Sequence, residues 1–265
     1  MRLVTWNCNS LSARKELVGL YLDEEKPDVL CLQELKLETD KVPRELFESR
    51  GYHVAVHGQR SWNGVLIASK FPLRDIEVGL PLADLGEARL IAATLDAPGT
   101  GSAIGPLRVV NLYCPQGQSV ESEKFAYKLG FYDGLIAWAE RARAAYASLV
   151  VCGDLNVAPG DDDVWDTKQF VDTPSFHPLE HQRLARLLAL GFHDAVRPHI
   201  KPRTFTFWDY RGGAFRFDQG LRIDHVLVSK SLVPHVSEAW VARPWRKKKG
   251  ELTPSDHAPV GIRLG

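Results

Sequence analysis

Short apolar runs separated by glycine, proline, asparagine and lysine recur along most of the chain, and four segments carry a helical pattern instead. Apolar runs of roughly four to eight residues with such boundaries predict β-strands. We therefore predict strands at residues 3–6, 29–34, 52–57, 64–69, 73–80, 88–95, 107–113, 149–152, 205–208, 223–229, 235–242 and 258–264. Helices are predicted at residues 12–24, 43–49, 122–146 and 179–190, the first of them capped by Ser12.

The strands between residues 52 and 113 follow one another without a long helix between them, which favours a largely antiparallel sheet. Residues 96–106 are rich in glycine, alanine and proline and are predicted to form a hairpin-like loop, and Asp161–Asp163 to form a surface acidic loop. No linker or low-complexity tract divides the 265 residues. The simplest α/β arrangement is a single domain over residues 1–265, with two packed sheets and flanking helices.

Five of the apolar runs carry, at an end or a rim, side chains that suit metal or phosphate chemistry. These are Asn7, Glu34, Asp154 with Asn156, Asp224, and Asp256 with His257. Taken singly, each has a structural explanation, because turns and surface loops also place polar residues after strands. Asp224 is harder to explain in that way, since a carboxylate inside an apolar strand needs a partner. Together, the five places indicate one site.

The chemistry that these residue types permit is specific. Asp154 and Asn156 point the same way if the backbone after the strand stays extended. Carboxylate and amide oxygens without cysteine suit a hard cation such as Mg²⁺. A histidine next to an aspartate, as in Asp256–His257, suits polarising a phosphoryl oxygen or moving a proton. With Asp154 to activate water, this set predicts metal-assisted hydrolysis of a phosphoester.

Composition and charge limit the classes of protein that could carry this chemistry. The 33 basic and 33 acidic residues cancel, which argues against a protein that coats nucleic acid by bulk charge but allows a local patch such as the basic residues at 243–249. Cys8, Cys31, Cys114 and Cys152 form no C-x-x-C pair and are predicted to be buried, reduced thiols of a cytoplasmic protein. No segment resembles a membrane span or a signal peptide, so no membrane partner is expected.

At the polar strand ends, the sequence resembles the exonuclease III family of abasic-site endonucleases, within the endonuclease/exonuclease/phosphatase superfamily. The resemblance spans essentially the whole chain and rests on several spaced motifs in order. They are Trp6-Asn7, Leu32-Gln33-Glu34-Leu35-Lys36, Asn111-Leu112-Tyr113-Cys114-Pro115-Gln116-Gly117, Gly153-Asp154-Leu155-Asn156, Leu221-Arg222-Ile223-Asp224 and Ser255-Asp256-His257-Ala258-Pro259. It implies a DNase I-like four-layer α/β sandwich, in which two packed, mixed and largely antiparallel sheets lie between helices.

The resemblance also implies a metal site. It makes Glu34 the main carboxylate ligand of Mg²⁺, for which Mn²⁺ can substitute, with Asn7 and Asp256 nearby. Asp154 and Asn156 are available to a second ion, and whether one or two ions act is left open. Relatives that carry an acidic residue two positions after the first asparagine differ from this chain, which has Asn9. We expect that difference to weaken metal binding at this edge or to leave a ligand bridged by water.

Catalytic roles follow from the same resemblance. Asp154 orients or deprotonates the attacking water, and Asn156 contacts that water or the scissile phosphate. Tyr113 donates a hydrogen bond to the phosphate. His257 contacts a phosphate oxygen and is oriented by Asp224.

Substrate contacts are implied at two further sets of residues. Gln116, Lys124 and Arg211 are the implied DNA contacts. The segment 203–211 resembles the part of the family that lines a pocket for a flipped abasic sugar. Its apolar wall is implied to be Phe207, Leu221 and Ile223, with Trp208 beside it. Some relatives have a larger aromatic residue where this chain has Leu221, which leaves the tightness of the pocket open.

The function implied is that of a Mg²⁺-dependent DNA-repair nuclease that cuts the phosphodiester 5′ to an abasic site, with 3′ to 5′ exonuclease and 3′ end-cleaning activity. Its substrate is double-stranded DNA with abasic sites or blocked 3′ ends, and it acts as a cytoplasmic, nucleoid-associated monomer. The alternative is a phosphatase or phosphodiesterase of the same superfamily that acts on a small molecule or a lipid head group. A DNA-binding protein without catalysis is a third reading, which the full set of polar residues argues against.

Overall fold

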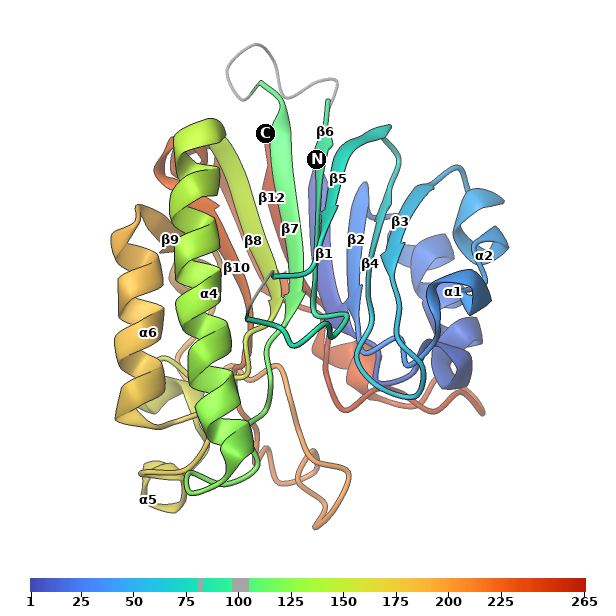
Figure 1. The fold of residues 1–265 in the computed structure, drawn as a ribbon. Coiled ribbons are helices and arrows are strands. Elements are labelled where there is room, and N and C mark those ends of the chain that lie inside the picture. The colour runs from blue at the N-terminus through green and yellow to red at the C-terminus, as the bar shows by residue number, and fades with distance from the viewer. Residues whose placement is uncertain (81–82, 97–104) are drawn as a thin grey trace.

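A computed structural model describes residues 1–80, 83–96 and 105–265. Two six-stranded mixed sheets pack face to face between helices (Figure 1). The apolar side chains between the sheets come from both of them and include Val29 and Ile67 of one sheet and Val109, Val150 and Val226 of the other. The four-layer α/β sandwich predicted from the resemblance is therefore confirmed.

The first sheet has the strand order β11-β12-β1-β2-β4-β3. Its strands are β1 (Arg2–Asn7), β2 (Val29–Gln33), β3 (His53–His57), β4 (Val65–Ser69), β11 (Val236–Val241) and β12 (Val260–Leu264). The central strands β1 and β2 are parallel, and the other pairs are antiparallel. Helix α1 (Leu11–Glu25) crosses from β1 to β2 and packs on the outer face of the sheet, and the short α2 (Glu45–Glu48) lies beside it.

The second sheet repeats this plan with the order β5-β6-β7-β8-β10-β9. Its strands are β5 (Leu73–Val78), β6 (Leu90–Leu95), β7 (Leu107–Tyr113), β8 (Ser148–Asp154), β9 (Phe192–Asp194) and β10 (Asp224–Ser229). The parallel pair β7–β8 is joined by the long helix α4 (Glu123–Ala145), which covers the outer face together with α6 (Pro178–Ala189). A short helix, α5 (Thr167–Phe170), precedes α6.

Short 3₁₀ turns complete the described structure. They are η1 (Thr39–Lys41), η2 (Asp161–Asp163), η3 (Arg197–His199), η4 (Lys230–His235) and η5 (Arg243–Arg246). No helix among the described residues has the length and apolar character needed to cross a membrane. All four cysteines are free and buried, as their apolar surroundings in the sequence predicted.

Most predicted elements are found within a few residues of their predicted ends, and the main differences are local. Residues 205–208 form no strand, because Phe207 makes only isolated bridges, to Leu221 and to His257. The three-residue strand β9 was missed, since it is too short to carry a period. Helix α1 is capped by Ser10 rather than by Ser12, through a 3.4 Å bond from the Ala13 amide. The loop predicted at 96–106 falls mostly outside the described residues.

The topology brings the polar strand ends to one edge. The parallel strands β1, β2, β7 and β8 all end there, and the antiparallel β10 begins there. The two chain termini lie at the opposite edge of the sheets (Figure 1). Near the polar edge, the buried Asn111 amide of β7 donates to the carbonyl oxygens of Leu32 and Leu66, at 2.8 Å each, and so joins the two sheets.

Strands β7 and β8 approach each other so closely at Gly153 that no side chain fits there. Its φ is +139°, and a Cβ atom there would lie 1.9 Å from the carbonyl oxygen of Leu112 on β7. We predict that Gly153→Ala lowers the free energy of unfolding by roughly 3 kcal/mol, measured by urea denaturation. The control is Gly130→Ala in α4, where a Cβ meets nothing within 4 Å. That change should raise stability by about 0.5–1 kcal/mol, and similar effects of the two changes would contradict this account.

Candidate active site

Two carboxylates from different sheets meet at the polar edge. Glu34 follows β2 with a φ of +54°, and Asp154 ends β8. The side-chain amide of Asn7, at the end of β1, donates to both of them, at 2.8 Å to Glu34 Oε1 and 2.9 Å to Asp154 Oδ2. Its own oxygen accepts the backbone N–H of Asn9 at 3.0 Å. Asn7 therefore presents its N–H₂ group to the two acids and holds them close together.

Glu34 is charged at neutral pH in this setting. Burial alone would raise the pKa of its carboxyl, but the Lys36 ammonium, 3.0 Å from Oε2, and the Asn7 hydrogen bond outweigh burial and hold that pKa below the usual range. Ligand atoms of Glu34, Asp154 and His257 all lie within 4.8 Å of one another. Two carboxylates this close could together hold a divalent cation.

His257 carries a proton on both nitrogens near neutral pH. Burial would lower the pKa of the imidazole, but the charge of Asp224 and a 2.8 Å hydrogen bond from Nδ1 to its Oδ2 raise that pKa to about 10. The other nitrogen, Nε2, lies 3.8 Å from Asp154 Oδ2. A protonated imidazole is a hydrogen-bond donor and a poor metal ligand. The chemistry of the group therefore assigns the cation to the carboxylates and leaves His257 as a donor.

The pKa of Asp154 is shifted in the opposite direction to that of Glu34. It lies directly across the β8–β10 ladder from Asp224, so two buried carboxyls are neighbours. Burial and then repulsion from Asp224 raise the pKa of Asp154 to about 7, although His257 and Asn7 act in the other direction. A carboxylate with such a pKa is a stronger base than an exposed aspartate.

The backbone conformation at Asn156 differs from the extended one that was expected. Its φ is +52°, so the chain does not stay extended after Asp154, and the condition for the predicted shared direction of the two side chains is not met. The Asn156 N–H turns back to donate to Asp154 Oδ1 at 2.9 Å, and its side-chain Nδ2 donates to the Cys114 carbonyl oxygen at 2.9 Å. The two residues are thus linked through a turn.

Tyr113 ends β7 directly beside Asp154 in the parallel ladder. The Arg89 guanidinium lies over its ring, 5.0 Å from the centroid. Burial and then the charges of Glu34 and Asp154 raise the pKa of the Tyr113 hydroxyl well above its usual value. The hydroxyl therefore keeps its proton and can donate a hydrogen bond within the site.

Asp256 lies outside the group of three that shares ligand distance. Its Oδ1 accepts from Asn9 Nδ2 at 3.0 Å and from the Ser255 hydroxyl at 3.2 Å. Asn9 Oδ1 in turn accepts from Lys36 Nζ at 2.5 Å. Asn9 therefore links Lys36 to Asp256 and has both ends of its amide engaged.

The implied DNA contacts flank this group. Gln116 and Lys124 line a hollow of about 500 Å³ beside Tyr113, together with the exposed indole of Trp62. Arg211 lies on the loop that follows Trp208, pairs with Asp209 at 2.8 Å and is largely exposed. Both places offer cationic side chains at the surface.

An apolar cluster adjoins His257. Leu221 and Ile223 pack with Ala158, Val164 and Phe176, and the half-buried Phe207 lies against them. The Phe207 ring is 4.9 Å from the His257 ring between centroids. Leu221 and Ile223 are buried, so the half-buried Phe207 is the member of this predicted wall that has exposed surface beside His257.

The prediction that Trp208 lies beside the apolar wall of the pocket was wrong. It is fully buried and packs with Phe205, Ala214 and Ala258 in a separate cluster. Its indole N–H donates to Asp218 at 3.0 Å. A side chain without exposed surface cannot line an open pocket, so Trp208 belongs to the core.

The basic segment 243–249 is largely engaged in packing. Arg246 is buried, with its guanidinium 4.9 Å from the centroid of Tyr210 and 5.0 Å from that of Phe215. Arg243 pairs with Asp218 at 3.0 Å. The exposed cations of the segment are Lys247 and Lys248.

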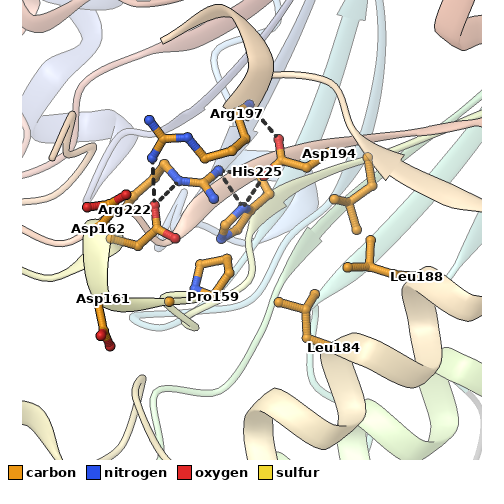
Figure 2. A pocket seen from close by; sticks show the side chains of 12 residues that line it. Pro159, Asp161, Asp162, Leu184, Leu188, Asp194, Arg197, Arg222 and His225 are labelled. Atoms are coloured by element: carbon orange, nitrogen blue, oxygen red, sulfur yellow. Dashed lines mark hydrogen bonds and ion pairs between the residues drawn. The ribbon is translucent and has the colours of Figure 1, made fainter. Parts of the chain in front are cut away.

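Behind the apolar cluster lies a second hollow with a buried charge network (Figure 2). Arg222 donates to Asp163 Oδ1 and to Asp194 Oδ2, at 2.6 Å each, and Arg197 pairs with Asp163 at 3.1 Å. The predicted surface acidic loop is therefore wrong for Asp163, which is buried because two arginines compensate its charge. His225, in the same network, bonds the Val157 carbonyl at 2.8 Å.

Two positively charged residues near the site were missed as candidates from the sequence. Arg222 sits between Leu221 and Ile223, and a charge between two apolar wall residues was its only signal. Lys128 lies on the buried face of α4 with Phe125 and Phe131. An ionisable residue at a core position of a helical pattern was the available sign.

Comparison with known proteins identifies relatives over the whole chain. A model of the Endonuclease/Exonuclease/phosphatase family matches residues 4–257. Exodeoxyribonuclease III of Haemophilus influenzae is 34% identical over 271 residues, 98% of each chain. Among solved structures, the 3′ phosphatase NExo from Neisseria, bound to a product DNA hairpin, is 36% identical with a TM-score of 0.93, covering 100% of this chain and 99% of that one. An AP endonuclease from Archaeoglobus fulgidus is 34% identical with a TM-score of 0.89, at the same coverage.

The Asp224–His257 pair gives a direct test of the electrostatics. We predict that Asp224→Asn lowers the pKa of His257 in the metal-free protein, because the largest opposing charge is removed and burial is then offset only by the more weakly acting Asp154 and Asp256. An NMR titration of the imidazole measures it, with Asp194→Asn, next to His225, as the control. In the parent, the pair's contribution to stability is complete below about pH 6.5 and is lost as the pH rises through about 10. An unchanged His257 pKa in Asp224→Asn would contradict the assignment.

Proposed function

This chain belongs to the Endonuclease/Exonuclease/phosphatase family, and from that premise we propose that it is a divalent-metal-dependent DNA-repair nuclease that cuts the phosphodiester 5′ to an abasic site. The observation that carries the proposal is the meeting of Glu34 and Asp154 under the Asn7 amide, next to a protonated His257. This places two anions and a hydrogen-bond donor around one point, as hydrolysis of a phosphoester requires.

The donor set fits Mg²⁺, with Mn²⁺ as a substitute. Glu34 would be the main ligand of the ion, with Asn7 and Asp256 close by, and Asp154, which lies within ligand distance of Glu34, would be available with Asn156 to a second ion. Buried carboxylates within ligand distance of one another are unfavourable without a compensating cation, which supports this choice. When bound, Mg²⁺ polarises the phosphate and neutralises the charge that develops on it.

The side chains divide the remaining work. Asp154, with its raised pKa, orients the attacking water and takes its proton, and Asn156 holds the turn that carries it. His257 donates from Nε2 to a phosphate oxygen while Asp224 fixes the ring through Nδ1. Tyr113 keeps its proton and donates a hydrogen bond from its hydroxyl to another phosphate oxygen. These interactions stabilise the charge on the transition state more than that on the substrate.

The substrate is proposed from the surfaces around this centre. A sugar without a base is the nucleotide that costs least to extrude, and the apolar wall of Phe207, Leu221 and Ile223 suits it. Gln116, Lys124 and Arg211 would contact the backbone of the duplex. The named relatives are an exodeoxyribonuclease, a 3′ phosphatase and an AP endonuclease, which supports adding 3′ to 5′ exonuclease and 3′ end-cleaning activities. We propose that the protein works as a monomer inside the cell, where its four free thiols stay reduced.

A phosphatase acting on a small molecule or a lipid head group would share the two carboxylates. It would have no need for exposed Trp62, Lys124 and Arg211 around the site, which favours the DNA reading. A catalytically inactive DNA-binding protein would have no need for the hydrogen-bonded group of Asn7, Glu34 and Asp154. Competition by undamaged duplex DNA separates the first alternative, since a small-molecule enzyme should ignore that competitor.

The proposed activity is tested by incision of a duplex with one abasic analogue. We expect a cut 5′ to the analogue with Mg²⁺ and none with EDTA. Asp154→Asn should lower kcat by roughly 10²- to 10⁴-fold, because the water loses its base, while binding of abasic DNA stays measurable. The absence of metal-dependent incision by the parent would overturn the proposed function. A loss of DNA binding together with turnover, in a folded Asp154→Asn variant, would overturn the role of Asp154.

The pocket wall gives a separate prediction. Phe207→Ala should lower kcat/KM for abasic incision by roughly tenfold relative to exonuclease activity on undamaged ends, since the sugar loses an apolar contact. Both rates are measured on the same duplex length. Trp208→Phe is the matched control, because Trp208 packs in a different cluster and should leave this ratio unchanged. An equal change of both rates in Phe207→Ala would place Phe207 outside the substrate pocket.

A further inference from the structure

A fully buried ion pair lies behind the site. Lys128 of α4 and Glu180 of α6 have no exposed side-chain surface, and Lys128 Nζ contacts Glu180 Oε1 directly. The two helices pack side by side on the outer face of the second sheet (Figure 1). Lys128 occupies a core position on α4, where an apolar residue would be expected. A buried ion pair is weak evidence for stability by itself, because well-packed apolar residues often replace one without loss.

The remaining hydrogen bonds of the pair connect it to the site. Besides Glu180, Lys128 Nζ donates to the carbonyl oxygen of Asn156 at 2.7 Å and to that of Gln116 at 3.1 Å. All three N–H donors of the ammonium therefore have partners. These acceptors belong to two chain segments that enter the site from the ends of β7 and β8.

Glu180 anchors a third segment. Its Oε1 accepts the Ser175 N–H at 3.1 Å, and its Oε2 accepts the His177 N–H at 3.0 Å, where helix α6 begins. The Ala158 N–H, just after the Asn156 turn, donates to the Ser175 carbonyl at 2.7 Å. Glu180 thus fixes Lys128 and braces the same turn from its other side.

The Asn156 turn needs such support. Its φ of +52° is uncommon for a residue other than glycine, and its carbonyl is buried and points to Lys128. Without the ammonium, that carbonyl would be left without a partner, and the turn would have to move to satisfy it. Because the Asn156 N–H holds Asp154 Oδ1, movement of the turn would also release Asp154.

We propose that Lys128, held in place by Glu180, is a positioning residue for hydrolysis, which fixes the backbone at Asn156 and Gln116 and through it the side chains of Asp154 and Asn156. The inference rests on the proposed function for its effect on catalysis. Its structural half, that the pair fixes the Asn156 turn, stands on the contacts alone. Lys128 touches neither metal nor substrate and acts only through the residues it holds.

The main test is Lys128→Met/Glu180→Gln, which removes both charges and keeps the side-chain volumes similar. The amide that replaces the Glu180 carboxylate still offers an oxygen to one backbone N–H at the start of α6. We expect kcat for abasic incision to fall by roughly 10- to 100-fold, with a smaller change in KM, because a small displacement of a catalytic group costs rate before binding. Parental kcat in the folded double variant would overturn the proposal.

The matched control breaks another ion pair between the same two helices. Asp133 of α4 pairs with Arg183 and Arg186 of α6, at 2.9 and 2.7 Å, and these contacts do not involve any residue of the site. Asp133→Asn should leave kcat unchanged. A loss of kcat as large as that of the double variant would assign both effects to helix packing and overturn the positioning role.

A double-mutant cycle tests whether Lys128 acts through the Asn156 turn. In an Asn156→Ala background, the loss of kcat caused by Lys128→Met/Glu180→Gln should shrink, because the side chain being positioned is absent. Fully additive losses would contradict coupling. Hydrogen exchange of the Asn156 amide in metal-free protein is the readout independent of activity, and it should speed up in the double variant and not in Asp133→Asn.

A milder variant covers the case in which the double variant does not fold by circular dichroism. Glu180→Asp then takes its place, since it keeps the charge but draws it away from Lys128. Lower kcat and faster Asn156 exchange in folded Glu180→Asp support the proposal, and parental values of both overturn it. If the parent cuts no abasic DNA, the proposed function fails, while the exchange experiment still decides the positioning of the turn.

Discussion

The amide of Asn7 is the contact on which the site depends. Glu34 and Asp154 belong to different sheets and carry like charges, so nothing in their own chemistry would bring them together. One N–H₂ group that donates to both, at 2.8 and 2.9 Å, fixes their separation from the end of β1. The distance between the two anions therefore follows from the way the two sheets pack. Deeper in the sandwich, Asn111 also joins the two sheets.

Around this contact, acidic and basic side chains lie next to one another. Lys36 faces Glu34, and His257 lies between Asp154 and Asp224. The two acids that Asn7 joins have pKa values shifted in opposite directions: Lys36 lowers that of Glu34, whereas burial and Asp224 raise that of Asp154. Three carboxyl groups in one small volume can in this way take three roles, as metal ligand, base and orienting group.

The sequence was informative where local pattern and site coincide. Apolar runs ending in Asn7, Glu34 and Asp154 located the edge correctly, because strand ends follow from period and boundary alone. Trp208 and Asp163 were misplaced, since their burial depends on Asp218 and on Arg222, which lie further along the chain. The sequence pattern did not predict the turn at Asn156, because the carbonyl oxygen of that turn is held by Lys128, a residue of α4. Contacts between distant segments carry no period, and only the folded chain reveals them.

The packing of Arg243 and Arg246 against aromatic rings reduces the positive charge that the basic segment offers to a polyanion such as DNA. Arg246 is buried and Arg243 is paired with Asp218, so two positive charges of the basic segment already have partners within the protein, and the net charge of the chain is zero. Cations that are engaged within the protein contribute little to the counterion release that drives sequence-independent binding to DNA.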